Sequence, residues 1–235
     1  MLMAEDRIGT ERIKGAYAWR TIIDSGSIII NGTDAPVELV NPYHSLYAAV
    51  TRKSRLGEPP EGWHPEQCMT REEALRSYTN WPAYGEFNED LKGSLEVGKL
   101  ADFVVIDRDY MTCPEEDIKD IQALLTVSGG EVVYQKDTSV PTIMWNGLPL
   151  TFNSELIVEP GKIYVPLNDV INGISAEKRA DGASMLVTLN GKSIKLPVKT
   201  VDGVDYVAVR ALFEGLGRNV TWYGDSRCVS IGWLK

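Results

Sequence analysis

Apolar residues change their spacing early in the chain. From about Glu11 to Ser25 they recur at helical intervals, and Thr10 is a suitable N-cap residue before them. The continuous β-branched run Ile28 to Ile30 then predicts a strand buried on both faces, as in a parallel sheet covered by helices. Asp34 would lie at the C-terminal end of this strand. Ligands and catalytic groups collect at that edge in α/β sheets and barrels, so Asp34 is a candidate site residue.

Two more helices are predicted before residue 90. Pro42 is placed to begin one of them, and Thr70 forms a capping box with Glu73 for the other. The second helix is expected to end near Trp81, because Pro82 follows. The succession of helix, buried strand and helix indicates an α/β fold.

Beyond Lys92 the pattern becomes that of a small β unit. A strand is predicted over Phe103 to Ile106, and a hairpin joins Leu124–Val127 to Glu131–Tyr134. Between them, a helix is expected to start at Pro114, because the three acidic residues after it favour the positive end of a helix.

The last part of the chain contains an internal repeat. Residues 164–189 and 206–231 align without a gap at an offset of 42. Each copy predicts a short strand, a helix of about two turns that ends at glycine, and a hairpin whose turn contains Gly-x-Ser. Two such copies can bury each other's apolar faces as one α+β domain. Identical pairs include Tyr164 and Tyr206, Val165 and Val207, Gly173 and Gly215, and Ser184 and Ser226.

The charge distribution supports the same division. Residues 1–138 carry a net charge of −10 and residues 139–235 carry +1, within a total of −9. The polar, turn-prone segment Gln135 to Pro141 is the expected linker. A strongly acidic half repels phosphate backbones, and no basic cluster interleaved with aromatic residues occurs, so nucleic acid is not an expected partner.

Composition excludes several classes of protein. The cysteines Cys68, Cys113 and Cys228 are odd in number and lie far apart without a CxxC motif, which indicates neither a disulfide framework nor a structural zinc site. No apolar stretch reaches the ~20 residues that cross a bilayer, and Met1 to Thr10 is too polar for a signal peptide. The chain as written is therefore expected to stay in the cytoplasm.

Several segments together resemble a known family. They are KGAYAWRTIIDSGSIIINGTDAPVE, LYAAVTR, MTREEALRSYT, KGSLEVGKLADFVVIDRD and LLTVSGGEVVYQ. Over about residues 3–136 they are similar to the C-terminal half of family 3 amidohydrolases, metal-dependent hydrolases of non-peptide carbon–nitrogen bonds. The resemblance implies the last α/β units of an incomplete TIM barrel in residues 1–90 and part of an accessory β-sandwich in residues 91–138. It places Asp34 at the end of the eighth barrel strand, as metal ligand and as acceptor of a proton from the attacking water.

The other metal ligands of that family are missing from this sequence. The family also needs a His-x-His pair and ligands on middle strands, whereas this chain has only His44 and His64, outside the family's ligand positions. The segment MLMAEDRIG resembles the stretch after the sixth-strand histidine, so the chain is expected to begin inside a longer parent. A catalytic zinc needs about three protein ligands. The resemblance thus implies a divalent metal, zinc, only in the complete parent, and an inactive chain with no tightly bound metal on its own.

Each candidate residue also has a plain structural interpretation. Asp34 fits an Asx-type turn or a cap before Pro36. His44, at helical spacing from Tyr47, fits a packing or surface role, and His64 fits either a pocket lining or an ordinary loop.

The C-terminal part resembles a second family. The phrases MWNGLPLTF, GKIYVPLNDVI, DYVAVRALFEGLGRNVTW and CVSIGW are similar to the copper amine oxidase N-terminal-like domain, a repeated module of exported Gram-positive proteins. No copper is expected, because residues 139–235 contain no histidine. The aromatic residues there are expected either in the core or on a surface that binds sugar or a protein partner. They are Trp145, Trp222, Tyr223 and Trp233.

Three hypotheses about function follow. The chain is the incomplete C-terminal portion of an amidohydrolase, or a non-catalytic cell-envelope module that binds a cell-wall component through its repeat domain. In the third, a separate polypeptide with the missing barrel half docks onto it. A partial barrel exposes apolar strand edges, so association with that half or self-association is expected. Because the repeat module indicates export and no export signal is present, the compartment of the parent stays open between cell envelope and cytoplasm.

Overall fold

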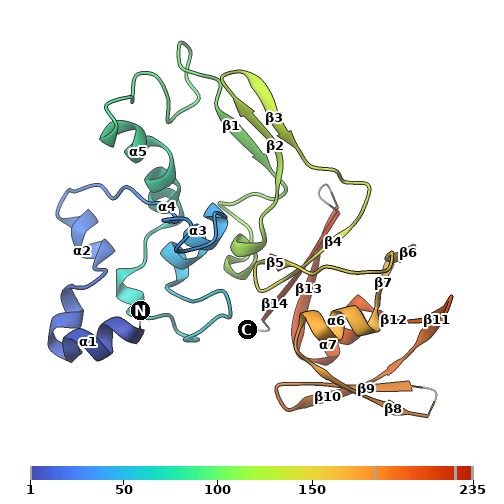
Figure 1. Cartoon of the computed structure of the whole chain (residues 1–235). Coiled ribbons are helices and arrows are strands. Elements are labelled where there is room, and N and C mark those ends of the chain that lie inside the picture. Colours follow the sequence, from blue (N-terminus) through green and yellow to red (C-terminus); the bar gives the residue numbers. More distant parts are fainter. Residues whose placement is uncertain (1, 183, 225–226, 234–235) are drawn as a thin grey trace. The chain divides into compact units, whose positions relative to one another are not determined.

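The chain folds into two compact units. A computed structural model describes residues 2–182, 184–224 and 227–233. The units are Met1–Lys136 and Asp137–Lys235, so their boundary lies in the segment expected to be the linker. Figure 1 shows helices in the first unit, followed by a three-stranded sheet, and a mixture of helices and sheets in the second.

Short helices and loops make up the N-terminal unit before residue 103. The single helix expected over Glu11–Ser25 is wrong: this stretch holds the end of α1, the 3₁₀ turn η1 and α2. Thr10 lies inside α1 instead of capping a helix. Tyr17 has a left-handed backbone with φ 52°, which no continuous α-helix accommodates. The helical elements are α1 (Leu2–Arg12), η1 (Ile13–Gly15), α2 (Trp19–Asp24), α3 (Pro42–Thr51), η2 (Pro65–Gln67), α4 (Arg71–Tyr78) and α5 (Asn80–Gly85).

The strand expected over Ile28–Ile30 is not formed. No described residue before Phe103 lies in a strand, and Ile28 and Ile30 are 39% and 56% exposed. The segment instead runs beside α4, where the Asn31 N–H donates to the Ser77 carbonyl at 3.0 Å. A strand buried on both faces needs a neighbouring strand at each edge and helices on both sides. The described residues of this unit offer Ile28–Ile30 no neighbouring strand.

Local helix signals were more accurate. Pro42 is the first residue of α3, and the Asn41 side chain accepts a hydrogen bond from the Tyr43 N–H. The capping box of Thr70 and Glu73 is confirmed at the start of α4. The break comes at Thr79 rather than at Pro82, which lies in the first turn of α5, where a proline costs no helical hydrogen bond.

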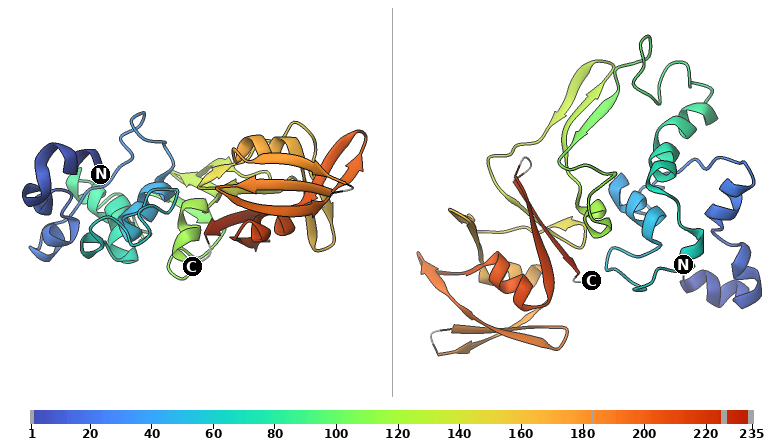
Figure 2. Two further views of the ribbon diagram at one scale, coloured as in Figure 1. Left: turned by 90° about the horizontal axis from the view of Figure 1, so that it is seen from below. Right: turned by 180° about the vertical axis from the view of Figure 1, so that it is seen from behind.

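Three antiparallel strands complete the unit, in the order β1-β2-β3. They are β1 (Phe103–Ile106), β2 (Ala123–Ser128) and β3 (Glu131–Gln135), which confirms the predicted strand and hairpin. The helix expected from Pro114 is the 3₁₀ helix η3 (Glu115–Asp120). Figure 2 shows the three strands as a ribbon of their own, next to the helices of the same unit.

A small core holds α3, α4 and η3 together. Helices α3 and α4 bury one side against η3 and the loop before it, whereas both outer strands of the sheet stay largely exposed. The core residues are Leu46, Tyr47, Ala49, Met69, Ala74, Tyr110, Cys113, Ile118 and Ile121.

The C-terminal unit contains the same succession of elements twice. Residues 162–189 form β7 (Lys162–Pro166), α6 (Leu167–Gly173), β8 (Glu177–Asp181) and β9 (Ser184–Leu189). Residues 204–233 form β12 (Val204–Ala208), α7 (Val209–Gly215), β13 (Arg218–Tyr223) and β14 (Cys228–Trp233). The remaining strands are β4 (Thr142–Trp145), β5 (Leu148–Pro149), β6 (Ile157–Glu159), β10 (Lys192–Pro197) and β11 (Lys199–Val201).

The two successions share one core. β7 and β12 pair antiparallel in the middle of the sheet β11-β12-β7-β6, with Val165 opposite Val207. α6 and α7 place Val170, Leu212 and Phe213 in the same fully buried cluster. The other sheets are β13-β14-β4-β5, in which β14 and β4 run parallel, and β10-β9-β8. Among the described residues, no helix has the length and apolar content that a bilayer crossing requires.

Candidate functional site

Asp34 lies in an exposed turn. Its φ of 52° is left-handed, and its carbonyl accepts a hydrogen bond from the Val37 N–H at 2.8 Å. The position at the end of a buried strand is therefore wrong, and the turn interpretation describes the backbone. Its carboxylate is exposed to solvent rather than held in a pocket.

The histidines do not join Asp34 in one site. His44 lies in the first turn of α3, where its Nε2 is 3.2 Å from the side-chain Nδ2 of Asn41. In the loop before η2, the Nδ1 of His64 is 3.1 Å from a Glu66 carboxylate oxygen, and the ring packs edge-on against Trp63. Across the residues that the structure describes, no three histidine, cysteine or acidic side chains form a group able to hold a metal ion. The described residues by themselves therefore lack the three protein ligands that a catalytic zinc needs.

No disulfide joins the three cysteines. Cys113 and Cys228 are buried and Cys68 is half-buried. Burial raises the pKa of the Cys68 and Cys113 thiols, which makes both poor nucleophiles and poor metal ligands at neutral pH.

Arg52 is a fully buried charge of the N-terminal unit, and sequence patterns did not single it out. Its guanidinium carbon lies 4.4 Å from the centre of the Trp19 ring and 4.8 Å from that of Trp63. The Nε donates to the Trp63 carbonyl and the Nη1 to the Tyr17 carbonyl. Burial lowers the Arg52 pKa, and Nη2 has no hydrogen-bond partner among the described residues. Arg52 thus connects the end of α3 to two loops.

An ion pair joins α2 to α4. Arg20 contacts both carboxylate oxygens of Glu73, at 2.9 Å for Oε1, and its guanidinium also donates to the Cys68 carbonyl. The hydrogen bond from Arg20 is the largest cause that holds the Glu73 pKa at about 2. Glu73 also caps α4, so one carboxylate both caps this helix and holds α2 against it.

Glu116 is the centre of a network between α3 and η3. The Tyr47 hydroxyl donates to its two carboxylate oxygens at 3.0 and 3.1 Å, and the Lys119 Nζ lies 2.9 Å away. Burial alone would raise the Glu116 pKa, but Lys119, the Tyr47 hydrogen bond and Lys53 together lower it. Each buried group here has a partner, so the network is structural.

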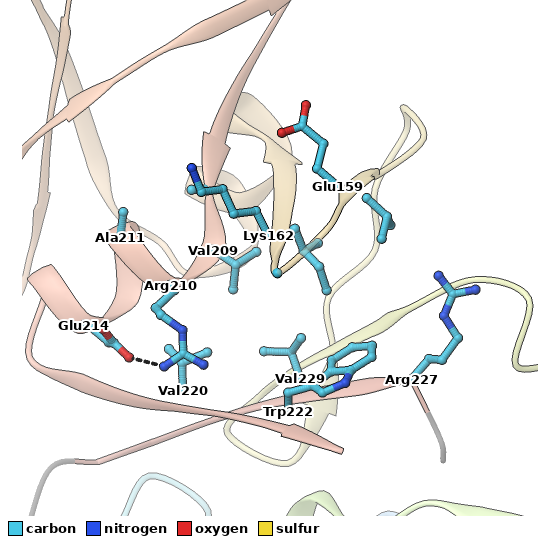
Figure 3. Close-up of a pocket in the computed structure, with 14 residues that line it drawn as sticks. Glu159, Lys162, Val209, Arg210, Ala211, Glu214, Val220, Trp222, Arg227 and Val229 are labelled. Atoms are coloured by element: carbon cyan, nitrogen blue, oxygen red, sulfur yellow. Dashed lines mark hydrogen bonds and ion pairs between the residues drawn. The ribbon is translucent and has the colours of Figure 1, made fainter. Parts of the chain in front are cut away.

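The C-terminal unit has a pocket of about 700 Å³. Its floor is apolar, with Val209 of α7, Val220 of β13 and Val229 of β14, and Trp222 stands beside them with 43% of its surface exposed. Figure 3 shows charged side chains at the edge of this apolar floor. They are Glu159, Lys162, Arg210, Glu214 and Arg227.

The four aromatic candidates of this unit do not share one role. Trp145 packs on the core, with its ring 5.3 Å from that of Phe213 and 5.1 Å from the Arg218 guanidinium. Trp222 lines the pocket, and Tyr223 follows it, half-buried, at the end of β13. The side chain of Trp233 lies outside the part that the structure describes. The exposure of Trp222, rather than its residue type, marks it as a candidate binding residue.

Sequence comparison assigns the N-terminal unit to a family. Residues 1–134 match the amidohydrolase family model, so the chain belongs to the amidohydrolase family. Over 131 residues it is 33% identical to the protein YtcJ of Bacillus subtilis. The aligned residues are 56% of this chain and 25% of that protein. It is 32% identical over 120 residues to the N-substituted formamide deformylase of Arthrobacter pascens. The aligned residues are 51% of this chain and 22% of that protein.

A plant relative aligns to a similar extent. The protein LONG AFTER FAR-RED 3 of Arabidopsis thaliana is 33% identical over 134 residues, which are 54% of this chain and 22% of that protein. The chain therefore spans about a quarter of the length of these relatives. No solved structure matches the chain.

Proposed function

We propose that residues 1–136 are the C-terminal part of a metal-dependent amidohydrolase that hydrolyses a non-peptide carbon–nitrogen bond. The family match over residues 1–134 is the observation that carries the proposal. A relative named as a deformylase of N-substituted formamides supports this bond type. In this proposal the unit is a remnant of the last α/β units of a TIM barrel with part of an accessory β-sandwich.

The proposed site is completed from outside these 235 residues. Asp34 is exposed in its turn and is therefore accessible to further metal ligands. Of the described side chains, no three form a metal-holding group, so the remaining donors have to come from another polypeptide or segment. A zinc ion is the proposed metal, and this chain alone is expected neither to retain it nor to be active.

Exposed apolar side chains support such a completion. Phe87 and Val97 are 88% and 108% exposed, and Val37, Val40, Val132 and Val133 are exposed as well. Such side chains offer apolar surface that another element could cover. The free edges of β1 and β3 also offer unpaired backbone groups, within the described residues, to an added strand.

A chimera tests this proposal. Residues 1–136 would replace the aligned segment of the Arthrobacter deformylase, and hydrolysis of an N-substituted formamide and bound zinc would be measured. We expect activity with Asp34 and none with Asp34→Ala, whereas Glu38→Ala, a carboxylate lost from the same exposed loop, keeps it. An active Asp34→Ala chimera, or an inactive chimera that holds zinc fully, would contradict the assignment.

A non-catalytic role of the C-terminal unit is a second proposal. The repeated order of elements and the exposed Trp222 support a copper amine oxidase N-terminal-like module that binds a cell-wall component of an exported parent. Copper has no place in this proposal, because residues 137–235 contain no histidine. Retention of the chain on cell-wall polysaccharide, lost in Trp222→Ala and kept in Trp145→Phe, would support it.

A further inference from the structure

We propose that the pocket of the C-terminal unit binds a small amphipathic anion, an aromatic or aliphatic body that carries one carboxylate. The pocket lies wholly within residues 158–229, so this inference does not depend on the hydrolase proposal. It competes with the polysaccharide proposal for Trp222, and the titration with a carboxylate and a sugar decides between the two.

Size and lining favour a small apolar body. A pocket of about 700 Å³ falls in the range of small-molecule sites, which span roughly 300 to 1,000 Å³. Val209, Val220 and Val229 form a buried floor on which a ligand loses apolar surface to the protein. The two successions of elements build it together, because Ile163 of β7 and Val209 of α7 both contribute.

Trp222 gives the pocket a flat wall. Its indole stands among the lining side chains, next to Val229 and on the side of Arg227 (Figure 3). An indole that is 43% exposed on a strand of a packed sheet has surface left for stacking. Offset stacking of a second aromatic ring on it would contribute beyond the area buried.

Charge at the rim favours an anion. Of the two acids in the lining, Glu214 pairs with Arg210 at 2.6 Å and Glu159 pairs with Lys199. Lys162 and Arg227 remain as lining cations without an ion pair in the part of the chain that the structure describes, although Lys162 also helps to lower the pKa of the Glu159 carboxyl. A bound carboxylate would supply the charge that the rim lacks.

Arg227 is held in place for this role. Its Nη1 donates to the Ser139 carbonyl at 2.6 Å, which fixes one corner of the guanidinium. A guanidinium has five N–H donors, so others stay available to a carboxylate. In Figure 3 Arg227 and Arg210 stand on opposite sides of Trp222, so a ligand on the indole meets Arg227 at one end.

The floor argues against a sugar. Sugar hydroxyls need a hydrogen-bond partner at almost every position, and valine side chains offer none. The paired rim acids are also engaged with cations rather than pointed at a ligand.

Calorimetric titration of the full chain tests the inference. The probes are naphthalene-2-acetate, its neutral amide and the N-acetylglucosamine trimer. We expect saturable binding of one carboxylate per chain and about tenfold weaker binding of the amide, because the amide forms no charge-assisted hydrogen bond. In the double variant Lys162→Ala/Arg227→Ala, the carboxylate should bind no more tightly than the amide. Lys195→Ala, an exposed lysine of β10 outside the pocket, should leave them unchanged.

Ala211→Trp provides a block of the pocket itself. Ala211 is an exposed lining residue of α7, so a large side chain there fills the pocket without entering the core. Binding should be lost at an unchanged melting temperature, and Trp222→Ala serves where the larger variant does not fold. The inference is overturned by no saturable heat, by equal affinity for carboxylate and amide, by binding that survives the block, or by a preference for the sugar.

Discussion

The guanidinium of Arg52 both donates to the carbonyl of Trp63 and lies against that residue's ring. The Nε to oxygen distance is 2.9 Å, and the guanidinium carbon is 4.8 Å from the ring centre. The Trp19 ring lies 4.4 Å away, so two rings and two carbonyl groups contact the cation, and the Glu66 carboxylate acts on it only at longer range.

Replacement of Arg52 should therefore destabilise the N-terminal unit strongly. Arg52→Ala leaves two carbonyl acceptors without their donor and a cavity between two tryptophans, which should lower the free energy of unfolding by about 3 kcal/mol. Arg52→Lys should cost less, because it keeps the charge but not the planar fork. Urea unfolding followed by tryptophan fluorescence measures both. Arg7→Ala, at an exposed position in α1, is the control. If Arg52→Lys is as stable as the unchanged chain, the planar guanidinium is not what stabilises this contact.

Glu73 makes stability depend on pH in a defined window. Its pKa is lowered from 4.5 to about 2 in the folded chain, chiefly by the hydrogen bond from Arg20. A depressed carboxyl pKa stabilises the fold above the unfolded value, and this contribution should disappear as the pH falls from about 4.5 to about 2. Denaturant unfolding across this range measures the slope.

Glu73→Gln separates the charge from the cap. Glutamine preserves the capping box, so the loss at neutral pH should reflect the partly exposed ion pair, about 1 kcal/mol, and the pH slope should flatten. Glu72→Gln removes a carboxylate one residue away, from an exposed pair with Arg76, and should change little. An unchanged slope in Glu73→Gln would show that other carboxyl groups set the acid sensitivity.

Signals contained in a few residues predicted structure well, and signals that need distant partners did not. Thr70 and Glu73 form a capping box whose parts lie three residues apart, so sequence alone suffices. Ile28–Ile30 has strand propensity, but a strand exists only with a neighbour to pair with, and this segment packs beside α4.

The same limit applies to the candidate sites. The role of Asp34 depends on donors that the described residues do not supply, so residue type and family motif could locate it but not complete a site. No sequence pattern indicates Arg52, because Trp19 and Trp63 contact it only in the folded chain. Trp222 was a candidate among four, and its exposure beside the valines of the pocket distinguishes it.

Gly62 should tolerate no side chain. Its φ is +81°, and a Cβ there would lie 2.5 Å from the Thr51 carbonyl oxygen, a backbone atom that cannot move aside cheaply. Gly98 has a similar φ of +96° but open space around it. Gly98→Ala should therefore cost about 1 kcal/mol for backbone strain alone, and Gly62→Ala about 2 to 3 kcal/mol by thermal unfolding. Equal losses would mean that the contact with Thr51 relaxes.

The exposed sheet of the N-terminal unit should drive self-association. β1 and β3 are its edges within the described chain, and Val132 of β3 is 60% exposed. A lysine on an edge strand opposes strand-to-strand pairing because its charge would be buried in the new contact. Val132→Lys should thus raise the monomer fraction in sedimentation velocity at a fixed concentration. Gln135→Lys adds the same charge at an exposed polar position of the same strand, so the charge alone can be separated from the loss of an apolar contact. If both lysines raise the monomer fraction equally, the edge of β3 and not the apolar side chain of Val132 is the contact, because one added positive charge on a chain of net charge −9 does not increase the repulsion between copies.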